Sequence, residues 1–292
     1  MLRYANERVS MKLAIVTDST CDWTEEEYAT HNVTMVPLKI MVGEESFLDQ
    51  SEISSEEFYD RMAASEKIPS TSQPSPGDFT AIYASLIDEG YDAIISMHIA
   101  PVLSGTIESA RIAAQNFDIP IIPHDSKGAT SALAIQVQKA CELRDSDKSL
   151  DEIVETLKDY TRHTHLYLSP DNTDNLLKGG RLTEEQAQGA AMLNIKLVFS
   201  LDEDGRLYSF DKVKGSKGVT KRFVDIIETY AKEQGRVRVR IMHARNYDAV
   251  EALTSALEES SVDCEIAAVD TCGATIATHV GVGVIGFAIA PA

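Results

Sequence analysis

A chain of 292 residues with 43% hydrophobic residues is long enough for two globular domains and does not have the composition of a disordered protein. Its 27 Lys and Arg residues against 46 Asp and Glu residues give a formal charge of −19, which repels nucleic acid and anionic lipid. Residues 205–245 differ, with eleven basic and four acidic residues (11 − 4 = +7). We expect an anionic partner to dock on that segment.

The four cysteines form no C-x-x-C pair and have no metal-like spacing with histidine, so we expect reduced thiols and no metal. The sequence shows no apolar signal segment and no run of eighteen apolar residues, which predicts a cytoplasmic protein. Residues 1–10 lack clear periodicity and precede a second methionine, Met11. We expect these ten residues to be a disordered leader.

From Leu13 onward, short β-branched runs alternate with amphipathic stretches, a rhythm typical of βα units around a largely parallel sheet. The candidate strands are LAIVTDS, TMVPLKIMV, DAIISMHI and IPIIPHDS, at residues 13–19, 34–42, 92–99 and 119–126. Ser54 and Glu57 have capping-box spacing before one predicted helix. A second predicted helix, residues 77–90, ends at Gly90.

The pattern changes after a predicted helix at residues 150–163. Residues 195–213 predict a hairpin around an Asp-Glu-Asp-Gly turn, and residues 236–244 alternate polar and apolar side chains. We therefore predict an α/β protein of two domains. An N-terminal domain, residues 11–165, has a largely parallel sheet flanked by helices, and a C-terminal α+β domain, residues 166–292, has a mainly antiparallel sheet.

Three predicted strands are followed by polar loops, VTDST, LSGT and HDSKGAT. Ligands of open α/β sheets bind beyond the carboxyl ends of strands, where helix N-termini offer free N–H donors. The sharpest candidate is Ser104 followed by Gly105, which can offer a hydroxyl and backbone N–H groups to an anion. Thr71 and Ser72 lie in a stretch with three prolines, IPSTSQPSPGDF, which suggests two hydroxyls held in a fixed place.

His279 precedes a G-x-G-x-x-G pattern, but only six residues follow Gly286, too few to complete a dinucleotide-binding βαβ unit. We therefore predict no nucleotide cofactor, and interpret His279 as a candidate anion donor or a buried core histidine. Arg181, after two glycines, suits docking or phosphate binding. Thr71, Ser72, Ser104 and His279 are neutral hydrogen-bond donors. Together they predict a site that binds an anion without reacting with it.

Six motifs in order, IVTDSTCDW, TSQPSPGDF, LSGTIESA, HDSKGAT, KGGRLT and THVGVGVIG, resemble the DegV family over about residues 11–290. The resemblance implies a lipid carrier that binds a long-chain fatty acid between two domains. It also implies a role in phospholipid metabolism, as the subunit that presents the acid to an ATP-using fatty acid kinase, with transient membrane contact possible.

By this resemblance, the carboxylate would meet Thr71, Ser104 and His279, while Arg181 would face the kinase. Lys214 aligns where relatives commonly carry an arginine, and Ala100 and Pro101 replace hydroxyl-bearing or small residues before LSGT. Two alternatives stay open: a serine hydrolase or acyltransferase that uses Ser104 and His279, and a lipid-responsive regulator that docks through residues 205–245.

Overall fold

The computed structural model describes residues 11–65, 67–185 and 194–292. A four-stranded parallel sheet forms the centre of the first part of the chain, with strand order β2-β1-β6-β7. Alternate residues of its strands point to opposite faces, so Leu13 and Ile15 face one core while Ala14 and Val16 face another. The strands are β1 (Leu13–Asp18), β2 (Val33–Val36), β6 (Ala93–His98) and β7 (Ile121–Asp125).

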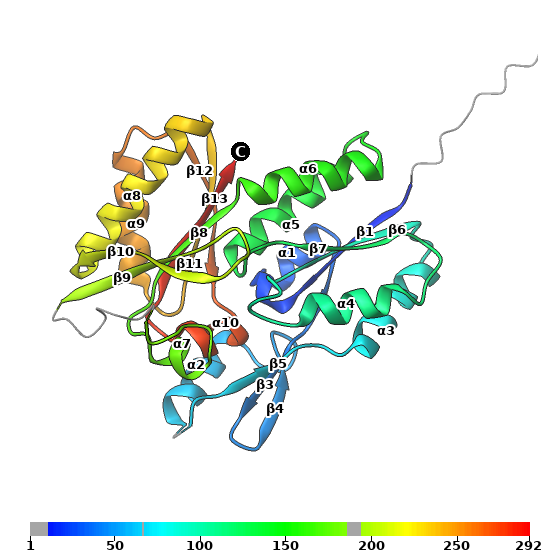
Figure 1. Ribbon diagram of the computed structural model, residues 1–292, viewed down its shortest axis with the longest axis horizontal. Coiled ribbons are helices and arrows are strands. Elements are labelled where there is room, and N and C mark those ends of the chain that lie inside the picture. The colour runs from blue at the N-terminus through cyan, green and yellow to red at the C-terminus, as the bar shows by residue number, and fades with distance from the viewer. Residues whose placement is uncertain (1–10, 66, 186–193) are drawn as a thin grey trace, which may run out of the picture.

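Helices cover both faces of this sheet (Figure 1). The helices on one face are α1 (Glu25–Thr30), α5 (Ser131–Arg144) and α6 (Leu150–Arg162), and on the other α3 (Pro76–Asp88) and α4 (Thr106–Ala114); the 3-10 turn η1 (Ser19–Cys21) follows β1. The predicted parallel α/β architecture is confirmed.

A six-stranded sheet, ordered β10-β9-β8-β13-β11-β12, forms the centre of the second part. All its neighbouring pairs are antiparallel except β11 with β12. The predicted hairpin is β9 and β10, and residues 236–244 supply β11. The strands are β8 (His165–Ser169), β9 (Ile195–Leu201), β10 (Leu207–Lys214), β11 (Val237–His243), β12 (Cys264–Thr271) and β13 (Ile285–Pro291).

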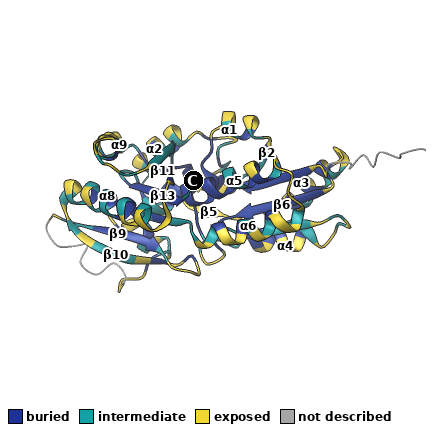
Figure 2. Ribbon diagram, turned by 90° about the horizontal axis from the view of Figure 1, so that it is seen from above, coloured by how far each residue is buried: buried dark blue, intermediate teal, exposed yellow. Residues whose placement is uncertain are grey.

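One face of the six-stranded sheet is covered by α8 (Gly215–Gln234) and α9 (Tyr247–Glu259). The other face packs against α5, which also contacts β1 and β6 of the first sheet. Ten of the fourteen residues of α5 are buried, as expected for a helix enclosed on all sides. Figure 2 shows buried strands beneath helices whose outer faces are exposed.

The stretch TMVPLKIMV is two strands rather than the single strand we predicted. Pro37 lies between β2 and β3 (Lys39–Val42), and β3 belongs to a separate antiparallel sheet ordered β4-β3-β5. Because proline lacks an N–H donor, it is a natural point at which a strand ends. The other strands of this sheet are β4 (Glu45–Leu48) and β5 (Ser70–Ser72), and α2 (Ser55–Ala64) connects them.

This small sheet and α2 lie beside α10 (Ala274–Val280), near the end of the chain, with α7 (Asp174–Lys178) adjacent to α10 (Figure 1). One hydrophobic core therefore contains Ile40 and Phe58 together with Leu168 and Phe199. The division of the chain into two domains between residues 165 and 166 stays a prediction. We call residues 11–165 the N-terminal half and residues 166–292 the C-terminal half.

Local signals explain several element boundaries. Ser54 accepts a hydrogen bond from the backbone N–H of Glu57 and begins α2, while the Glu57 carboxylate binds Arg61 instead of closing a capping box. Ser75 and Asp78 form a complete capping box before α3, with Pro76 in the first turn.

The four cysteines form no disulfide. Within the described ranges, every helix is too short or too polar to cross a bilayer.

Candidate functional site

A cavity lies between the two halves of the chain. Its empty space, including the part that opens to solvent, is ≈ 700 Å³. Most of the lining is apolar and comes from both halves, including Leu38, Ile99, Leu166, Leu168, Leu176 and Met242. The polar side chains of the lining are Thr71, Ser104, Thr130, Arg181, Thr275 and His279.

Thr71 and His279 meet in the wall of this cavity, although 208 residues separate them in the sequence. The Thr71 hydroxyl lies 3.0 Å from Nε2 of His279. Thr71 is placed by β5, where it pairs with Ile40 of β3, and His279 lies in the last turn of α10. The structure thus brings these two candidate residues together, and their contact with a carboxylate stays a prediction.

His279 is packed so that its second ring nitrogen faces no hydrogen-bond partner among the described residues. A Cβ atom on Gly179 would lie 2.7 Å from Nδ1 of His279, so only glycine leaves room for the ring there. Burial, with a smaller contribution from the positive charge of Arg181, lowers the pKa of His279 to about 4. The ring is therefore neutral at pH 7 and can donate one hydrogen bond.

Ser104 lines the same cavity at the start of α4. Its hydroxyl lies 2.9 Å from the hydroxyl of Thr106, the first residue of α4. The structure gives a packing reason for Gly105, while its predicted contact with a ligand stays a prediction. A Cβ atom there would lie 2.1 Å from Oε1 of Gln73, so the glycine makes room for the Gln73 amide, which donates to Ser109.

Ser72 does not reach the cavity. It follows Thr71 in β5, and successive side chains of a strand point to opposite faces, so Ser72 is exposed while Thr71 is half-buried. The structure thus separates the two hydroxyls that we expected to act together.

Arg181 is half-buried in the cavity lining, and its expected contact with a kinase stays a prediction. Its guanidinium donates to the backbone oxygens of Leu103, at 3.2 Å, and Gly179. These bonds tie the loop after α7 to the residue before Ser104. Arg181 therefore places a positive charge beside the candidate head-group donors. Lys214 is exposed at the end of β10 and does not line the cavity.

The two alternatives receive little support from this geometry. Within the described residues, His279 bonds to Thr71 and Ser104 to Thr106, so Ser104 and His279 do not form a nucleophile and base pair. In residues 205–245, seven of the eleven basic side chains are ion-paired: Arg206, Lys221, Arg222, Arg236, Arg238, Arg240 and Arg245. The expected basic docking surface is thus largely neutralised, and buried Arg240 instead joins β11 to Asp270 and Glu27.

Sequence reasoning missed Thr130, Thr275 and Gly179. Thr130 and Thr275 are among the residues that line the cavity, but neither stood out, since threonine is ordinary at the start of a helix. The Gly-Gly pair before Arg181 was visible, yet its contact with His279 required the fold. No cluster of three or more potential metal ligands occurs in the parts of the chain that the structure describes.

Comparison with known proteins gives a consistent result. Residues 12–292 match the profile of the DegV family, whose members are described as uncharacterised proteins. A DegV domain-containing protein of Deinococcus radiodurans is 34% identical over 286 residues, 96% of this chain and 99% of that protein. A relative in Listeria innocua is 29% identical over 276 residues, 94% of this chain and 97% of that protein.

Solved structures of the family superimpose closely. A fatty-acid-binding DegV family protein of Thermus thermophilus has a TM-score of 0.91 and 31% identity, over 97% of this chain and 100% of that chain. DegV of Bacillus subtilis, described as a fatty acid binding protein, has a TM-score of 0.86 and 28% identity over the same shares. Because a family profile spans nearly the whole sequence and the fold agrees, this chain belongs to the DegV family.

Proposed function

We propose that this protein binds a long-chain fatty acid in the cavity between its halves and holds the carboxylate with Thr71, Ser104 and His279. The observation that carries the proposal is the cavity itself, an apolar space whose wall brings these three neutral donors together. Fatty acid binding by the relatives from T. thermophilus and B. subtilis supports it.

The head-group arrangement suits a carboxylate. A carboxylate that leaves water must regain hydrogen bonds, and hydrogen bonds to a charged group contribute about 1.5–3 kcal/mol each. Thr71, Ser104 and neutral His279 supply such donors, and Arg181 adds a nearby positive charge. Ser72 takes no part, because its side chain lies on the other side of β5.

The hydrocarbon tail supplies most of the affinity in this proposal. At about 0.8 kcal/mol per buried methylene, roughly fourteen methylenes offer on the order of 11 kcal/mol before the entropic cost of association. Leucines, isoleucines and Met242 in the wall provide the apolar surface for this contact. The head group then determines the orientation of the ligand, and the tail determines most of its binding affinity.

The protein would act as a non-catalytic, cytoplasmic carrier that takes up no cofactor and presents its bound acid to an ATP-using fatty acid kinase, with brief contact with a membrane to load or unload. In this proposal Arg181, which lines the cavity, would meet the phosphate formed at the head group, and exposed Lys214 would contact the partner. A serine-reactive phosphonate would leave Ser104 unlabelled.

The direct test is native mass spectrometry of the protein purified from cells, followed by lipid extraction. We expect a bound fatty acid, and a higher unfolding temperature when delipidated protein receives one. A protein that carries no acid and gains no stability from adding one would refute the proposal. Mixing the loaded protein with a fatty acid kinase and ATP tests the presenting role separately.

A further inference from the structure

The turn between β9 and β10 lies beside the cavity. Leu201 and Leu207, on either side of this turn, pair with each other and both line the cavity. We call residues 202–206 the hairpin tip. A Cβ atom on Gly205 of the tip would lie 2.6 Å from the Cβ of Ala100, so the tip rests directly on the N-terminal half (Figure 1).

The hairpin tip is held together by its own hydrogen bonds. The Asp202 carboxylate accepts from the backbone N–H groups of Asp204 and Arg206, at 3.0 and 2.8 Å, and the Gly205 N–H donates to the Asp202 carbonyl. Gly205 has a φ of 83°, a conformation that glycine adopts readily. Gly205 is buried, and the other four residues of the tip are exposed. The tip is therefore suited to move as one unit.

The joint between the hairpin tip and the N-terminal half is made by packing. Within the described ranges, no hydrogen bond or ion pair joins the tip to that half, and Arg206 forms its ion pair with Asp204 of the same tip. What holds the joint is the fit of Gly205 against Ala100 and against the Lys127 carbonyl oxygen, which would lie 3.2 Å from a Cβ on Gly205.

Polar contacts hold the two halves together elsewhere. Arg245 of the C-terminal half binds Glu56 and Asp60 of α2, each at 2.7 Å. Other contacts between the halves join Gly273 to Asp22, Ala274 to Asp49, Arg240 to Glu27 and Arg181 to Leu103. Segments with few such contacts open at the lowest cost in free energy. Of these joints, the one at the hairpin tip is therefore expected to separate first.

A second, larger groove adjoins the hairpin tip. Its empty space, including the part that opens to solvent, is ≈ 1840 Å³. Asp202 and Glu203 of the tip line this groove, and so do Lys127 and Gly128 of the N-terminal half. Leu201 lines both the groove and the cavity. The residues at the joint therefore adjoin the groove, and the flanking leucines adjoin the cavity.

The ribbon behind the tip has a point at which it can bend. The pairing of β9 with β8 ends at Ser200 and Tyr167, so Leu201 and the tip extend beyond it. The register of β9 with β10 shifts between Ser209 and Asp211. Irregularities of this kind bend a strand locally. Movement there would carry both flanking leucines away from the cavity.

We propose that the hairpin tip is a gate for the fatty acid, and that its separation from Ala100 joins the cavity to the larger groove and lets the acyl chain enter and leave. This inference rests on the proposed fatty acid site and adds a route to it. A gate changes the rates of binding and release by the same factor and leaves the affinity unchanged, because it acts on the barrier and not on the bound state.

A cross-link tests whether the tip must move. Ala100→Cys with Gly205→Cys places two thiols at the joint, where a local shift of about 1 Å gives the Cβ separation of a disulfide. The oxidised variant, loaded with hexadecanoic acid, is mixed with excess phosphatidylcholine vesicles, and the acid that moves to the vesicles is measured over time. We expect release about tenfold slower than from the reduced variant, and loading slower by a similar factor.

Crowding the joint should have the opposite effect. In Gly205→Ala the new Cβ meets Ala100 at 2.6 Å, so the tip is held away and release should be several-fold faster. Gly235→Ala is the matched control, because Gly235 has the same φ of 83° at the end of α8 but nothing within 4 Å of the added atom. Adding Ala100→Gly to Gly205→Ala removes the closest contact and should return release towards the rate of Ala100→Gly alone.

The outcomes separate this inference from the fatty acid site. Failure of the wild-type protein to bind hexadecanoic acid would overturn the site, and the gate with it. Binding with equal release from the oxidised and reduced variants would overturn the gate alone. Slower release with an equally lower dissociation constant would also overturn it, because tighter closure around the ligand would then explain the rate. If the disulfide does not form, release from Gly205→Ala no faster than from Gly235→Ala would overturn the gate.

Discussion

Gly179→Ala tests how His279 is held in the site. The new Cβ would lie 2.7 Å from Nδ1 of His279 and 2.9 Å from the Asn175 carbonyl oxygen, both closer than real Cβ contacts allow. The φ of Gly179 is −74°, which alanine adopts without strain, so the effect comes from crowding alone. The ring must move away from Thr71, which lies 3.0 Å from its other nitrogen.

Overpacking of this kind costs about 1–3 kcal/mol, which corresponds to an unfolding temperature roughly 2–5 °C lower for a protein of this size. Loss of one hydrogen bond to a bound carboxylate, about 1.5–3 kcal/mol, predicts fatty acid binding weaker by about ten- to a hundredfold. Differential scanning fluorimetry measures the first effect and calorimetric titration the second.

Two further variants complete this experiment. Gly77→Ala is the matched control, because its Cβ would meet only Ser75 Oγ at an ordinary 3.5 Å, within α3, and both stability and binding should be preserved. Adding His279→Ala to Gly179→Ala removes the main crowding, so the double variant should recover part of the lost stability. Wild-type binding and stability in Gly179→Ala would refute the argument that this contact positions His279.

Three other predictions concern ligand binding, the pH dependence of stability and lipid selection. Replacing Thr71 and Ser104 together by alanine should weaken fatty acid binding by about 1–3 kcal/mol in a titration, and unchanged affinity would place the carboxylate elsewhere. Burial lowers the pKa values of His124 and His279 to about 4, below the value near 6.5 in the unfolded chain. The free energy of unfolding should therefore be highest above pH 6.5 and fall as the pH decreases to 4. His279→Gln should make this pH dependence shallower in denaturant unfolding, and an equal dependence in variant and wild type would contradict the prediction. Leu201 lines both the cavity and a second, larger groove, so Leu201→Ala should shift the extracted lipids towards longer chains, and an unchanged lipid profile would show that this wall does not limit length.

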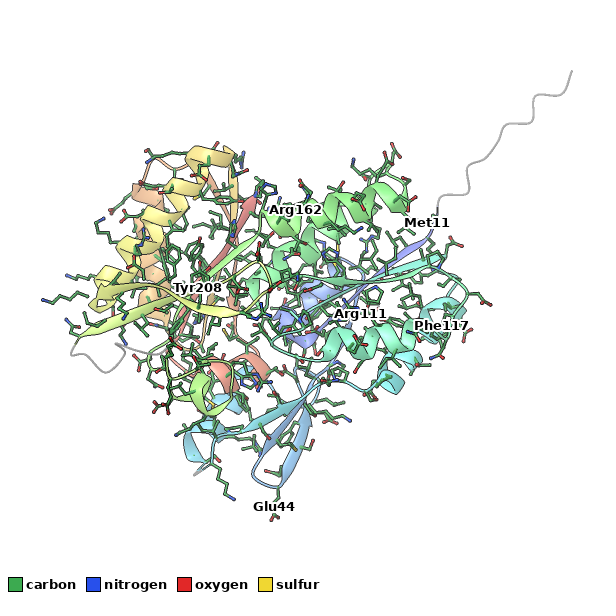
Figure 3. All side chains as sticks on the ribbon, viewed as in Figure 1. Met11, Glu44, Arg111, Phe117, Arg162 and Tyr208 are labelled. Carbon is green, nitrogen blue, oxygen red and sulfur yellow. The ribbon has the colours of Figure 1, made fainter. Side chains whose placement is uncertain are left out.

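The larger groove adjoins the cavity and is also lined by residues of both halves. It shares Leu166 and Leu201 with the cavity, and its lining includes Arg111 of α4, Arg162 of α6 and Tyr208 of β10 (Figure 3). These two leucines therefore lie in the wall that the two spaces share. This arrangement is why a single shortened side chain is expected to change the length of the space available to a tail.

Much of the fold could be predicted from periodicity because burial imposes it. The runs that became β1 and β6 are fully buried, and strands of a covered parallel sheet read as continuous apolar runs. The hairpin of β9 and β10 was visible from its turn. The stretch at 34–42 was misread because its apolar residues outweighed Pro37, whose missing N–H allows the chain to leave one sheet and enter another.

The site was less predictable, because it depends on contacts across the chain. Thr71 and His279 are brought together by β5 and α10, and nothing in the sequence near either residue records that contact. The exposure of Ser72 could have been inferred had STS been recognised as a strand, since alternate residues then face apart. Gly105 and Gly179 were visible as glycines, but the side chains that require them, Gln73 and His279, are distant in sequence.

The donors around the cavity come from opposite ends of the polypeptide. Thr71 and Ser104 lie in the N-terminal half, and His279 and Arg181 in the C-terminal half, where one hydrophobic core also crosses between them. Neither half expressed alone would contain a complete receptor for the acid. A bound ligand would contact both halves, so ligand binding should raise the cooperativity of unfolding and slow proteolysis throughout the molecule. Release of the ligand must then involve a loosening of the contact between the halves.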